Sequence, residues 1–334
     1  WRLFITIKVV EMWLRFAIEA LRSGSRVYHA HDPSVLLPSL VAAKFGNGKL
    51  LYDCHELAIA MPGASSFKNR LVRLYERIFL YFVDRVIMSD GAFRANVFRN
   101  AHNYTGPIDY IYNFPMSVNL PTDRRDIRER LVIAQEDLVV GYTGNIGPFR
   151  GLDIAISSMT HWPENTHLVM IGGCSESYKH LLLQLAENYQ VSSRVHFLPP
   201  VPPDDVSLWL SGANLALVLI QNAGLSYYGS APTKMFEAIM ARVPQVSSNF
   251  PEFRRVVLDN GIGPVGRLVD PADREEIGKT IREFLTDEIL SNSYRKNADA
   301  LAFNVYTWQS QEHLLVSLYN EMLGDSYHNT FSND

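Results

Sequence analysis

The sequence predicts an α/β fold made of two Rossmann-like domains that face a cleft. Short apolar segments alternate with longer amphipathic ones along most of the 334 residues, and this length exceeds what one core usually holds. The alternation stops in the polar segment 116–125, which contains Pro121, and then starts again. We therefore expect a first domain over residues 1–120 and a second over 121–305.

The first domain is expected to begin with an amphipathic helix over residues 1–21. Charged residues recur there every three or four positions, which suits a helix surface and not a membrane span of about 20 apolar residues. We interpret it as a helix of a domain whose first elements precede Trp1. The next elements are expected as strands at 27–30, 49–52, 85–88 and 110–112, with helices at 36–45 and 68–83.

The second domain repeats this alternation, which is typical of a parallel sheet with crossover helices. Its strands are expected at 138–142, 167–171, 194–198, 215–220 and 245–247. Its helices are expected to start at residue 152, to cover 178–188 and to start again at 233.

Composition excludes several classes of protein. The net charge of −4 and the isoelectric point near 6.2 give no basic field that would attract nucleic acid. Cys54 and Cys174 are the only cysteines, and they are too few and too far apart for a disulfide framework or a zinc motif. No short apolar run ends in a signal-peptide cleavage site. These features fit a cytoplasmic protein.

A glycine-rich turn follows the strand expected at 138–142. Gly144, Gly147 and Gly151 allow the backbone to approach a phosphate, and Arg150 can add a charge-assisted hydrogen bond. The spacing GxxGxxG differs from the dinucleotide fingerprint and from the P-loop. An ordinary strand-to-helix turn stays as the alternative.

A second segment, 230–244, starts a helix with polar residues in an apolar setting. Pro232 suits a first helical turn, and Glu237 lies about one turn further on. Its carboxylate can accept two hydrogen bonds from a ribose diol, and Lys234 can pair with a phosphate. A solvated Glu237 on an ordinary amphipathic helix is the alternative. The apolar residues on both sides favour a largely buried carboxylate, which is costly without a partner.

Two clusters of histidines and acids follow strands of the first domain. His31 and Asp32 follow the strand expected at 27–30, and His55 follows the strand expected at 49–52. The carboxyl ends of parallel strands collect ligands, so these are candidate binding residues. Their spacing matches no common zinc pattern, and we predict no metal there. For His29, a structural role is expected.

The helix expected at 68–83 carries Lys68, Arg70, Arg73 and Arg77 beside apolar residues. This pattern is typical of helices that lie on anionic membrane surfaces. A core-packed helix with a solvated basic side is an equal alternative.

In their order along the chain, these segments resemble those of glycosyltransferase family 4, which contains retaining enzymes of the GT-B fold. The resemblance runs from about Tyr28 to the C-terminal region. It is carried by the blocks 29–33, 52–57, 84–87, 113–115, 144–151, 168–173, 194–198 and 230–244. Residues 306–308 and the helix after them resemble the family's closing helix, so we expect a helix over 306–326 that returns to the first domain.

The resemblance assigns roles to single residues. Arg150 matches the residue that holds the donor diphosphate, and Glu237 matches the second Glu of the E-x7-E motif, which binds the ribose. His55 matches the catalytic-site histidine near the donor sugar. The donor-binding set would be Gly144, Asn145, Gly147, Arg150, Ser230, Lys234 and Glu237.

Three departures from the family pattern bear on activity. Gly229 stands where the first Glu of E-x7-E is expected, and no acid between Asp205 and Glu237 replaces it. Asn145 stands where an arginine is common, and the family's first strand and glycine loop would precede Trp1.

The resemblance implies transfer of a sugar from a nucleotide-sugar donor to a hydroxyl of a carbohydrate or lipid-linked acceptor, with retention and without a metal or other cofactor. It suggests surface-polysaccharide or glycolipid synthesis at the inner face of a bacterial membrane. The alternatives are a GT-B sugar-nucleotide epimerase and a non-catalytic protein that binds a nucleotide sugar.

Overall fold

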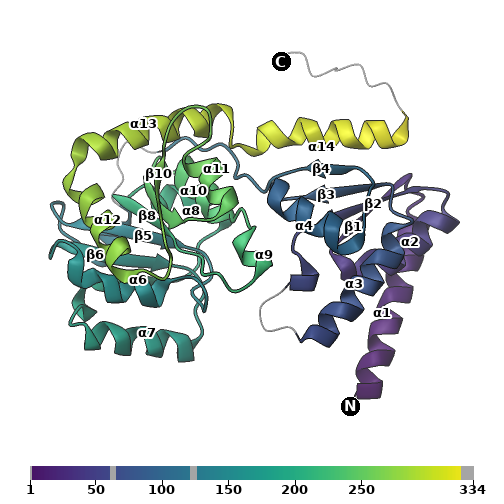
Figure 1. The fold of residues 1–334 in the computed structure, drawn as a ribbon, viewed down its shortest axis with the longest axis horizontal. Coiled ribbons are helices and arrows are strands. Elements are labelled where there is room, and N and C mark those ends of the chain that lie inside the picture. Colours follow the sequence, from purple (N-terminus) through teal and green to yellow (C-terminus); the bar gives the residue numbers. More distant parts are fainter. Residues whose placement is uncertain (1, 61–64, 121–125, 325–334) are drawn as a thin grey trace. The chain divides into compact units, whose positions relative to one another are not determined.

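The computed structural model describes residues 2–60, 65–120 and 126–324 (Figure 1). The chain divides into two compact units. Unit 1 is formed by Trp1–Tyr112, Gly224–Ser230 and Gln311–Asp334, and unit 2 by Asn113–Ala223 and Ala231–Ser310. Residues 121–125 of the expected linker and the last two residues of the helix expected at 306–326 lie outside the described residues.

Unit 1 contains a parallel four-stranded sheet in the order β1-β2-β3-β4. The strands are β1 (Val27–His31), β2 (Lys49–Cys54), β3 (Arg85–Met88) and β4 (Ile108–Tyr110). The last strand was predicted at 110–112, but it begins two residues earlier, at Ile108, because Ile108 pairs with Val86 of β3. The register places His31 opposite Asp53 at the carboxyl ends of β1 and β2.

Helices cover this sheet and supply the rest of its core. They are α1 (Arg2–Arg22), α2 (Leu36–Phe45), α3 (Ser66–Leu80), α4 (Ala92–His102) and α9 (Leu225–Tyr228), with α14 (Trp308–Leu323) joining unit 1 from Gln311 onward. The Ser65 side chain caps α3 by accepting a hydrogen bond from the Lys68 backbone N–H, which starts this helix earlier than predicted. Tyr52 and Phe98 are buried in the core between sheet and helices.

Unit 2 contains a parallel six-stranded sheet in the order β10-β9-β8-β5-β6-β7. The strands are β5 (Leu138–Thr143), β6 (Thr166–Ile171), β7 (Val195–Leu198), β8 (Leu215–Val218), β9 (Gln245–Ser248) and β10 (Gly266–Val269). This is the doubly wound order: β6 and β7 follow on one side of β5, and β8, β9 and β10 follow on its other side. The chain order therefore reverses between β5 and β8, where Val140 pairs with Leu215. Ligands of such sheets bind outside the carboxyl ends of the strands at that reversal.

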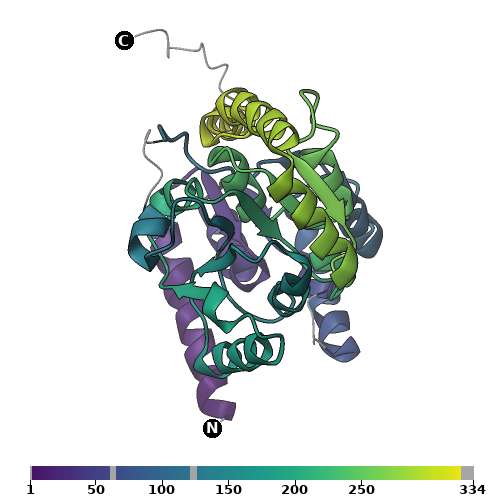
Figure 2. The ribbon, with the colours of Figure 1, turned by 90° about the vertical axis from the view of Figure 1, so that its left-hand side faces the viewer.

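Both faces of this sheet are covered by helices, as Figures 1 and 2 show for α7 and α13 on opposite sides. The helices are α5 (Asp126–Leu131), α6 (Leu152–Ser158), α7 (Glu176–Asn188), α8 (Val206–Leu210), α10 (Thr233–Met240), α11 (Pro251–Val257), α12 (Arg274–Thr286) and α13 (Glu288–Asn304). Neighbouring strand residues belong to different cores: Val140 packs with α6, α7 and α12, and Val139 with residues of α8 and α10. Burial on both faces explains the continuous apolar strands, and it confirms the predicted α/β architecture with parallel sheets.

Candidate functional site

The turn between β5 and α6 and the start of α10 meet at the reversal point of the unit 2 sheet. Thr143 ends β5, and Gly144 follows with φ of +103°, a conformation that side chains rarely adopt. A Cβ atom added at Gly144 would lie 3.5 Å from Lys234 Nζ in the first turn of α10. The structure thus brings the glycine-rich turn and Lys234 together.

Lys234 is held by an aromatic residue of β5. Its Nζ donates a hydrogen bond of 2.7 Å to the Tyr142 hydroxyl and lies 4.3 Å from the centre of the Tyr142 ring. The Tyr142 hydroxyl in turn donates a 2.7 Å hydrogen bond to the carbonyl of Asn145. Burial, reinforced by the charge of Arg150, lowers the pKa of Lys234 to about 7. The basic side chains of Lys234 and Arg150 therefore lie close enough to interact at this turn, which suits an anionic ligand such as a diphosphate.

Glu237 lies on the same helix and is bonded to the end of β5. The hydroxyl of Thr143 donates a 2.9 Å hydrogen bond to Glu237 Oε2. Burial raises the pKa of Glu237, and the Thr143 bond and the Lys234 charge oppose that rise. One bond leaves the carboxylate with capacity for further donors, such as ribose hydroxyls. Neither Thr143 nor Tyr142 was named as a site residue from the sequence, although both directly precede the glycine-rich turn that predicted phosphate binding.

Two other predicted donor residues have different surroundings. A Cβ atom added at Gly147 would lie 3.0 Å from Asn145 Nδ2, so Gly147 keeps the turn tight. Ser230 belongs to unit 1, where its hydroxyl donates a 2.8 Å hydrogen bond to the Tyr227 carbonyl. The structure does not group Ser230 with Lys234 and Glu237.

The surroundings of Gly229 account for the missing first Glu of the E-x7-E pattern. A Cβ atom added there would lie 2.6 Å from Cδ1 of Phe93 and 3.1 Å from Cγ of Arg94. The Phe93 ring also packs edge-on against Tyr228, with 5.4 Å between ring centres. A glutamate at this position would require these side chains to move, so glycine and the Phe93 ring fit together as a pair.

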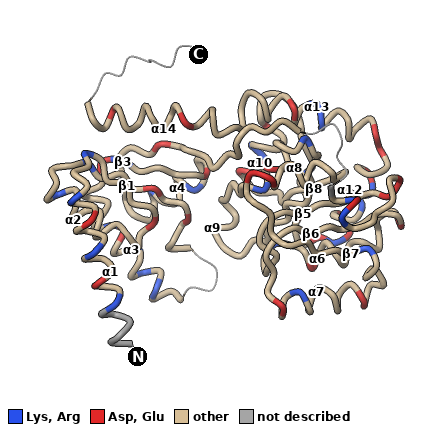
Figure 3. Tube along the Cα trace, turned by 180° about the vertical axis from the view of Figure 1, so that it is seen from behind, with Lys and Arg blue, Asp and Glu red and all other residues tan. Residues whose placement is uncertain are grey.

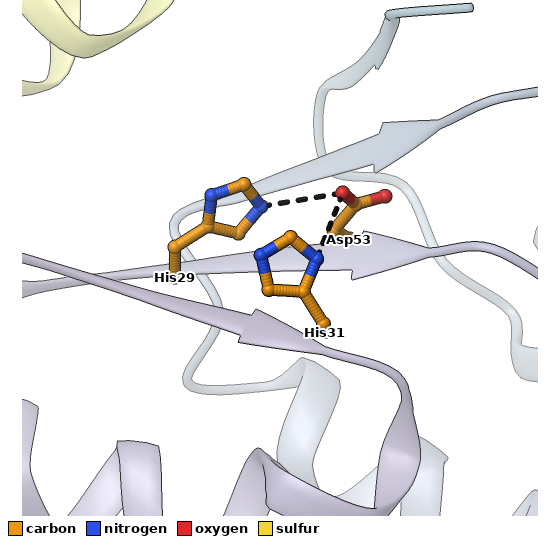
Figure 4. Close-up of side chains that lie close together, drawn as sticks. All are labelled: His29, His31 and Asp53. Carbon is orange, nitrogen blue, oxygen red and sulfur yellow. Dashed lines mark ion pairs between the residues drawn. The ribbon is translucent and has the colours of Figure 1, made fainter. Parts of the chain in front are cut away.

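In unit 1, three histidines surround one carboxylate at the carboxyl ends of β1 and β2. Asp53 Oδ2 lies 3.4 Å from His29 Nε2, 3.3 Å from His31 Nδ1 and 3.3 Å from His55 Nε2. Figure 4 shows the first two of these contacts. The imidazoles of His31 and His55 are also joined by a 3.1 Å hydrogen bond between Nδ1 and Nε2. The predicted residues His31 and His55 are thus brought together, with Asp53 as the shared partner.

The ionisation of this cluster follows from its packing. Burial alone would raise the pKa of Asp53, but the imidazoles of His29 and His55 outweigh it and lower the pKa to about 2. The Asp53 carboxylate raises the pKa of His55, whereas burial and the neighbouring His29 lower that of His31. Of these last two, His55 is the better hydrogen-bond donor near neutral pH.

Asp32, the other residue predicted on the acceptor side, has a strained backbone. Its φ is +66°, which is uncommon outside glycine, and its N–H donates a 3.0 Å hydrogen bond to the Asp53 carbonyl. This bond ties the turn after β1 to β2. Such strain is common at binding sites.

Arg94 is a site residue that sequence reasoning missed. Its buried guanidinium donates a 2.8 Å hydrogen bond to the His55 carbonyl and 2.9 Å hydrogen bonds to the carbonyl and hydroxyl of Ser226, and it pairs with Asp90. Arg94 therefore fixes the backbone of His55. The only signal in the sequence was the i,i+4 spacing of Asp90 and Arg94.

Solved structures with a similar fold span nearly the whole chain. Sucrose-phosphate synthase from Thermosynechococcus elongatus matches with a TM-score of 0.80 and 18% identity, covering 95% of this chain and 78% of that one. HepE from Anabaena, solved in complex with UDP-glucose, matches with a TM-score of 0.72 and 17% identity, covering 91% and 82%. At this identity the likeness shows the fold alone, which is GT-B as predicted.

Curated relatives are similar over part of their length. The D-inositol 3-phosphate glycosyltransferase of Xylanimonas cellulosilytica is 26% identical over 223 residues, covering 61% of this chain and 51% of the relative. That of Mycobacterium ulcerans is 24% identical over 289 residues, covering 83% and 59%. The chain thus spans about half the length of the curated relatives it matches. Residues 123–300, more than half of the chain, match the family model described as glycosyl transferases group 1, and the chain therefore belongs to this family.

Proposed function

We propose that the chain is a retaining glycosyltransferase of family 4 that moves a sugar from a nucleotide donor to a hydroxyl acceptor. The observation that carries this proposal is the arrangement at the reversal point of the unit 2 sheet. There Lys234, its pKa lowered by burial and by Arg150, lies on the same helix as the hydrogen-bonded carboxylate of Glu237. The cationic side chains can bind a diphosphate, and the Glu237 carboxylate can accept hydrogen bonds from a ribose diol. Together they match the two polar parts of a nucleoside diphosphate.

In the proposed reaction, the bond between the anomeric carbon and the diphosphate breaks, and the acceptor oxygen bonds to that carbon on the same face. The acceptor proton passes to the departing phosphate oxygen. Arg150, Lys234 and the backbone N–H groups at the start of α10 would stabilise the charge that develops on the diphosphate. We propose His55 as the residue that contacts the transferred sugar, with Asp53 and Arg94 holding its ring and its backbone. His31 and Asp32 are proposed on the acceptor side.

We propose that this chemistry needs no metal, since side-chain cations and N–H groups supply the positive charge. Activity should survive dialysis against EDTA. Loss of activity that returns on adding Mg²⁺ or Mn²⁺ would contradict this part of the proposal.

The names of the relatives guide the choice of substrates. The HepE structure contains UDP-glucose, so UDP-sugars are the first donors to test. The curated relatives are named for glycosyl transfer to D-inositol 3-phosphate. We propose a carbohydrate or lipid-linked acceptor in the assembly of bacterial surface polysaccharides or glycolipids.

The test begins with binding of UDP and a set of nucleotide sugars to the purified chain, measured by thermal shift and calorimetry. Glu237→Ala should weaken UDP binding strongly, whereas Glu187→Ala, which changes an exposed glutamate of α7, should not. Equal affinity of UDP for the Glu237 variant and the unchanged chain would refute the ribose assignment.

Product analysis with a membrane extract as the acceptor source then separates the three candidate functions. Release of UDP with a glycosylated product supports the transferase. An altered free sugar without an acceptor would identify an epimerase, and tight binding without turnover would identify a binding protein.

We further propose that α3 docks unit 1 on the anionic cytoplasmic face of a membrane. A stripe at spacings of three and four positions is exposed along this helix and consists of Phe67, Leu71, Leu74, Ile78 and Tyr81. Exposed basic residues accompany the stripe, namely Lys68, Arg70, Arg73 and Arg77. Figure 3 shows basic positions in blue along α3. Apolar and basic side chains together match the acyl and headgroup layers of an anionic bilayer. Within the part of the chain that the structure describes, no helix is long and apolar enough to cross a membrane.

Sedimentation with lipid vesicles tests this docking. Binding should increase with the fraction of anionic lipid, because each basic residue near the surface contributes about 1 kcal/mol. The double variant Lys68→Glu/Arg70→Glu should bind more than about tenfold more weakly. Lys279→Glu/Lys296→Glu, which changes exposed lysines of unit 2, is the matched control. Binding that ignores anionic lipid, or an equal loss in the control, would contradict docking through α3.

A further inference from the structure

The cluster at the carboxyl ends of β1 and β2 has the spacing of a metal site. One ligand atom each from His29, His31 and Asp53 lies within 4.8 Å of those of the other two. Asp53 Oδ2 is 3.4 Å from His29 Nε2 and 3.3 Å from His31 Nδ1 (Figure 4). Zn²⁺ bonds to imidazole nitrogen and carboxylate oxygen at about 2.0–2.2 Å, so a tetrahedral ion places its ligands about 3.3–3.5 Å apart. The carboxylate is therefore already at ligand spacing from both imidazoles.

Hydrogen bonds within the chain account for only part of this cluster: His31 Nδ1 lies 3.1 Å from His55 Nε2. Among the residues that the structure describes, His29 Nε2 and Asp53 Oδ1 are buried and have no hydrogen-bond partner. A buried polar atom without a partner is destabilising, and such atoms are rare in folded proteins. An ion bound by His29 Nε2 would remove that destabilisation at the nitrogen.

The other ring nitrogen of His29 has the partner that metal-binding histidines usually have. His29 Nδ1 lies 2.8 Å from the hydroxyl of Tyr319 on α14, within unit 1. When that hydroxyl accepts from Nδ1–H, the lone pair of His29 is on Nε2, the atom nearest Asp53. A partner on the second ring nitrogen fixes the tautomer and orients the ligand.

The site is rigid and can be reached from solvent. All three residues lie on the paired strands β1 and β2, with His31 opposite Asp53 in the register. The His31 side chain is 58% exposed, which gives an ion an entry path. His55 Nε2, 3.3 Å from the same Asp53 oxygen, is the nearest further nitrogen.

Although the sequence spacing predicted no metal at these strand ends, we propose from the spatial grouping that unit 1 binds one divalent transition-metal ion of the Zn²⁺ class through His29 Nε2, His31 Nδ1 and Asp53 Oδ2. Imidazole with a carboxylate suits Zn²⁺ and Co²⁺ and not Mg²⁺, which prefers oxygen ligands. This ion is separate from the proposed transfer chemistry, which uses unit 2 side chains on the diphosphate.

The experiment is titration of the untagged, EDTA-treated chain with Zn²⁺ by calorimetry and with Co²⁺ by visible absorption. We expect one ion per chain, with ligand-field bands of a low-coordinate site for Co²⁺. His31→Ala removes a ligand from an exposed position and should weaken binding about 100-fold or more. Tyr319→Phe removes only the partner of His29 and should weaken binding about 10- to 100-fold. His313→Ala, an exposed histidine of α14, is the matched control and should bind as the unchanged chain does.

Absence of saturable binding at one equivalent would overturn the proposal, as would unchanged affinity in His31→Ala. An equal loss in His313→Ala would show non-specific binding and overturn it too. If His31→Ala does not fold, as judged by circular dichroism, His31→Gln serves in its place. UDP affinity is measured in parallel, so that failure of the ion site is distinguishable from failure of the proposed nucleotide site.

Discussion

Replacement of Lys234 by methionine should stabilise the chain while it weakens nucleotide binding. The pKa of Lys234 falls from 10.5 to about 7, chiefly because the ammonium is buried. At pH 8 the folded chain has lost this proton and the unfolded chain keeps it. The pH then lies two and a half units below the ordinary pKa, and each unit corresponds to about 1.4 kcal/mol, so Lys234 lowers the free energy of unfolding by about 3 kcal/mol. Lys234→Met removes this cost.

The pH dependence gives the sign of the effect. Between pH 7 and 10.5 the unfolded chain binds more protons at this position than the folded chain, so the stability of the unchanged protein rises with pH. The advantage of Lys234→Met should be greatest below pH 7 and vanish near pH 10.5. Urea unfolding at pH 7, 8, 9 and 10 measures this difference. Lys279→Met, at an exposed position of α12, is the control and should show no such trend.

Calorimetry with UDP supplies an independent measurement. A bound diphosphate favours the charged amine, so UDP binding at pH 8 should take up close to one proton per chain, seen as a dependence of the heat on the buffer. Lys234→Met should lose the proton uptake and bind UDP about 10- to 100-fold more weakly, as expected for a lost charge-assisted contact. A stability difference that does not change with pH, or UDP binding without proton uptake, would refute the reasoning.

Three further changes test the packing around the two sites. Thr143→Val removes the hydrogen-bond donor to Glu237. It should lower the free energy of unfolding by about 1–3 kcal/mol at pH 8, and it should also lower the affinity for UDP. Equal stability of the variant and the unchanged chain by urea unfolding would contradict the pairing. Gly229→Glu should destabilise unit 1 by about 1–3 kcal/mol, because its Cβ atom meets the Phe93 ring; a variant that melts at the unchanged temperature would show that the glycine is not required by packing. Glu76 is buried, and burial raises its pKa from 4.5 to about 7. The folded chain therefore favours the protonated carboxyl, and the stability that this proton gives is present at low pH and lost as the pH rises through 7. Glu76→Gln should therefore raise the melting temperature at pH 8.5 and change it little at pH 5, and equal shifts at both pH values would count against this explanation.

Much of the fold could be predicted from the sequence because its strands are buried on both faces. The apolar run at 138–142 became β5, since Val139 and Val140 pack into cores on opposite sides of the sheet. β10 (Gly266–Val269) was not predicted, because Gly266 and Arg267 interrupt the apolar pattern. The shift of β4 arose because strand pairing with β3 sets its ends, and pairing leaves no local signal.

The candidate site could be predicted only where neighbours in the sequence carry it. Gly144, Lys234 and Glu237 could be named as candidates because a glycine-rich turn and a helix start have local patterns. The bond between Thr143 and Glu237 joins residues 94 positions apart, and that between Arg94 and Ser226 joins residues 132 positions apart. No periodicity or spacing encodes such pairs, because they form only when strands and helices assemble.

The segment Gly224–Ser230 has a consequence for engineering this chain. It belongs to unit 1, although the residues on both sides of it belong to unit 2. A fragment that ends near residue 112 would lack Ser226, and the guanidinium of Arg94 would lose two hydrogen-bond acceptors in a buried position. Excision of residues 1–112, or their exchange between relatives at a single crossover, would therefore separate residues that fold as one body. Recombinant fragments and chimaeras should carry the segment Gly224–Ser230 together with residues 1–112, which it stabilises.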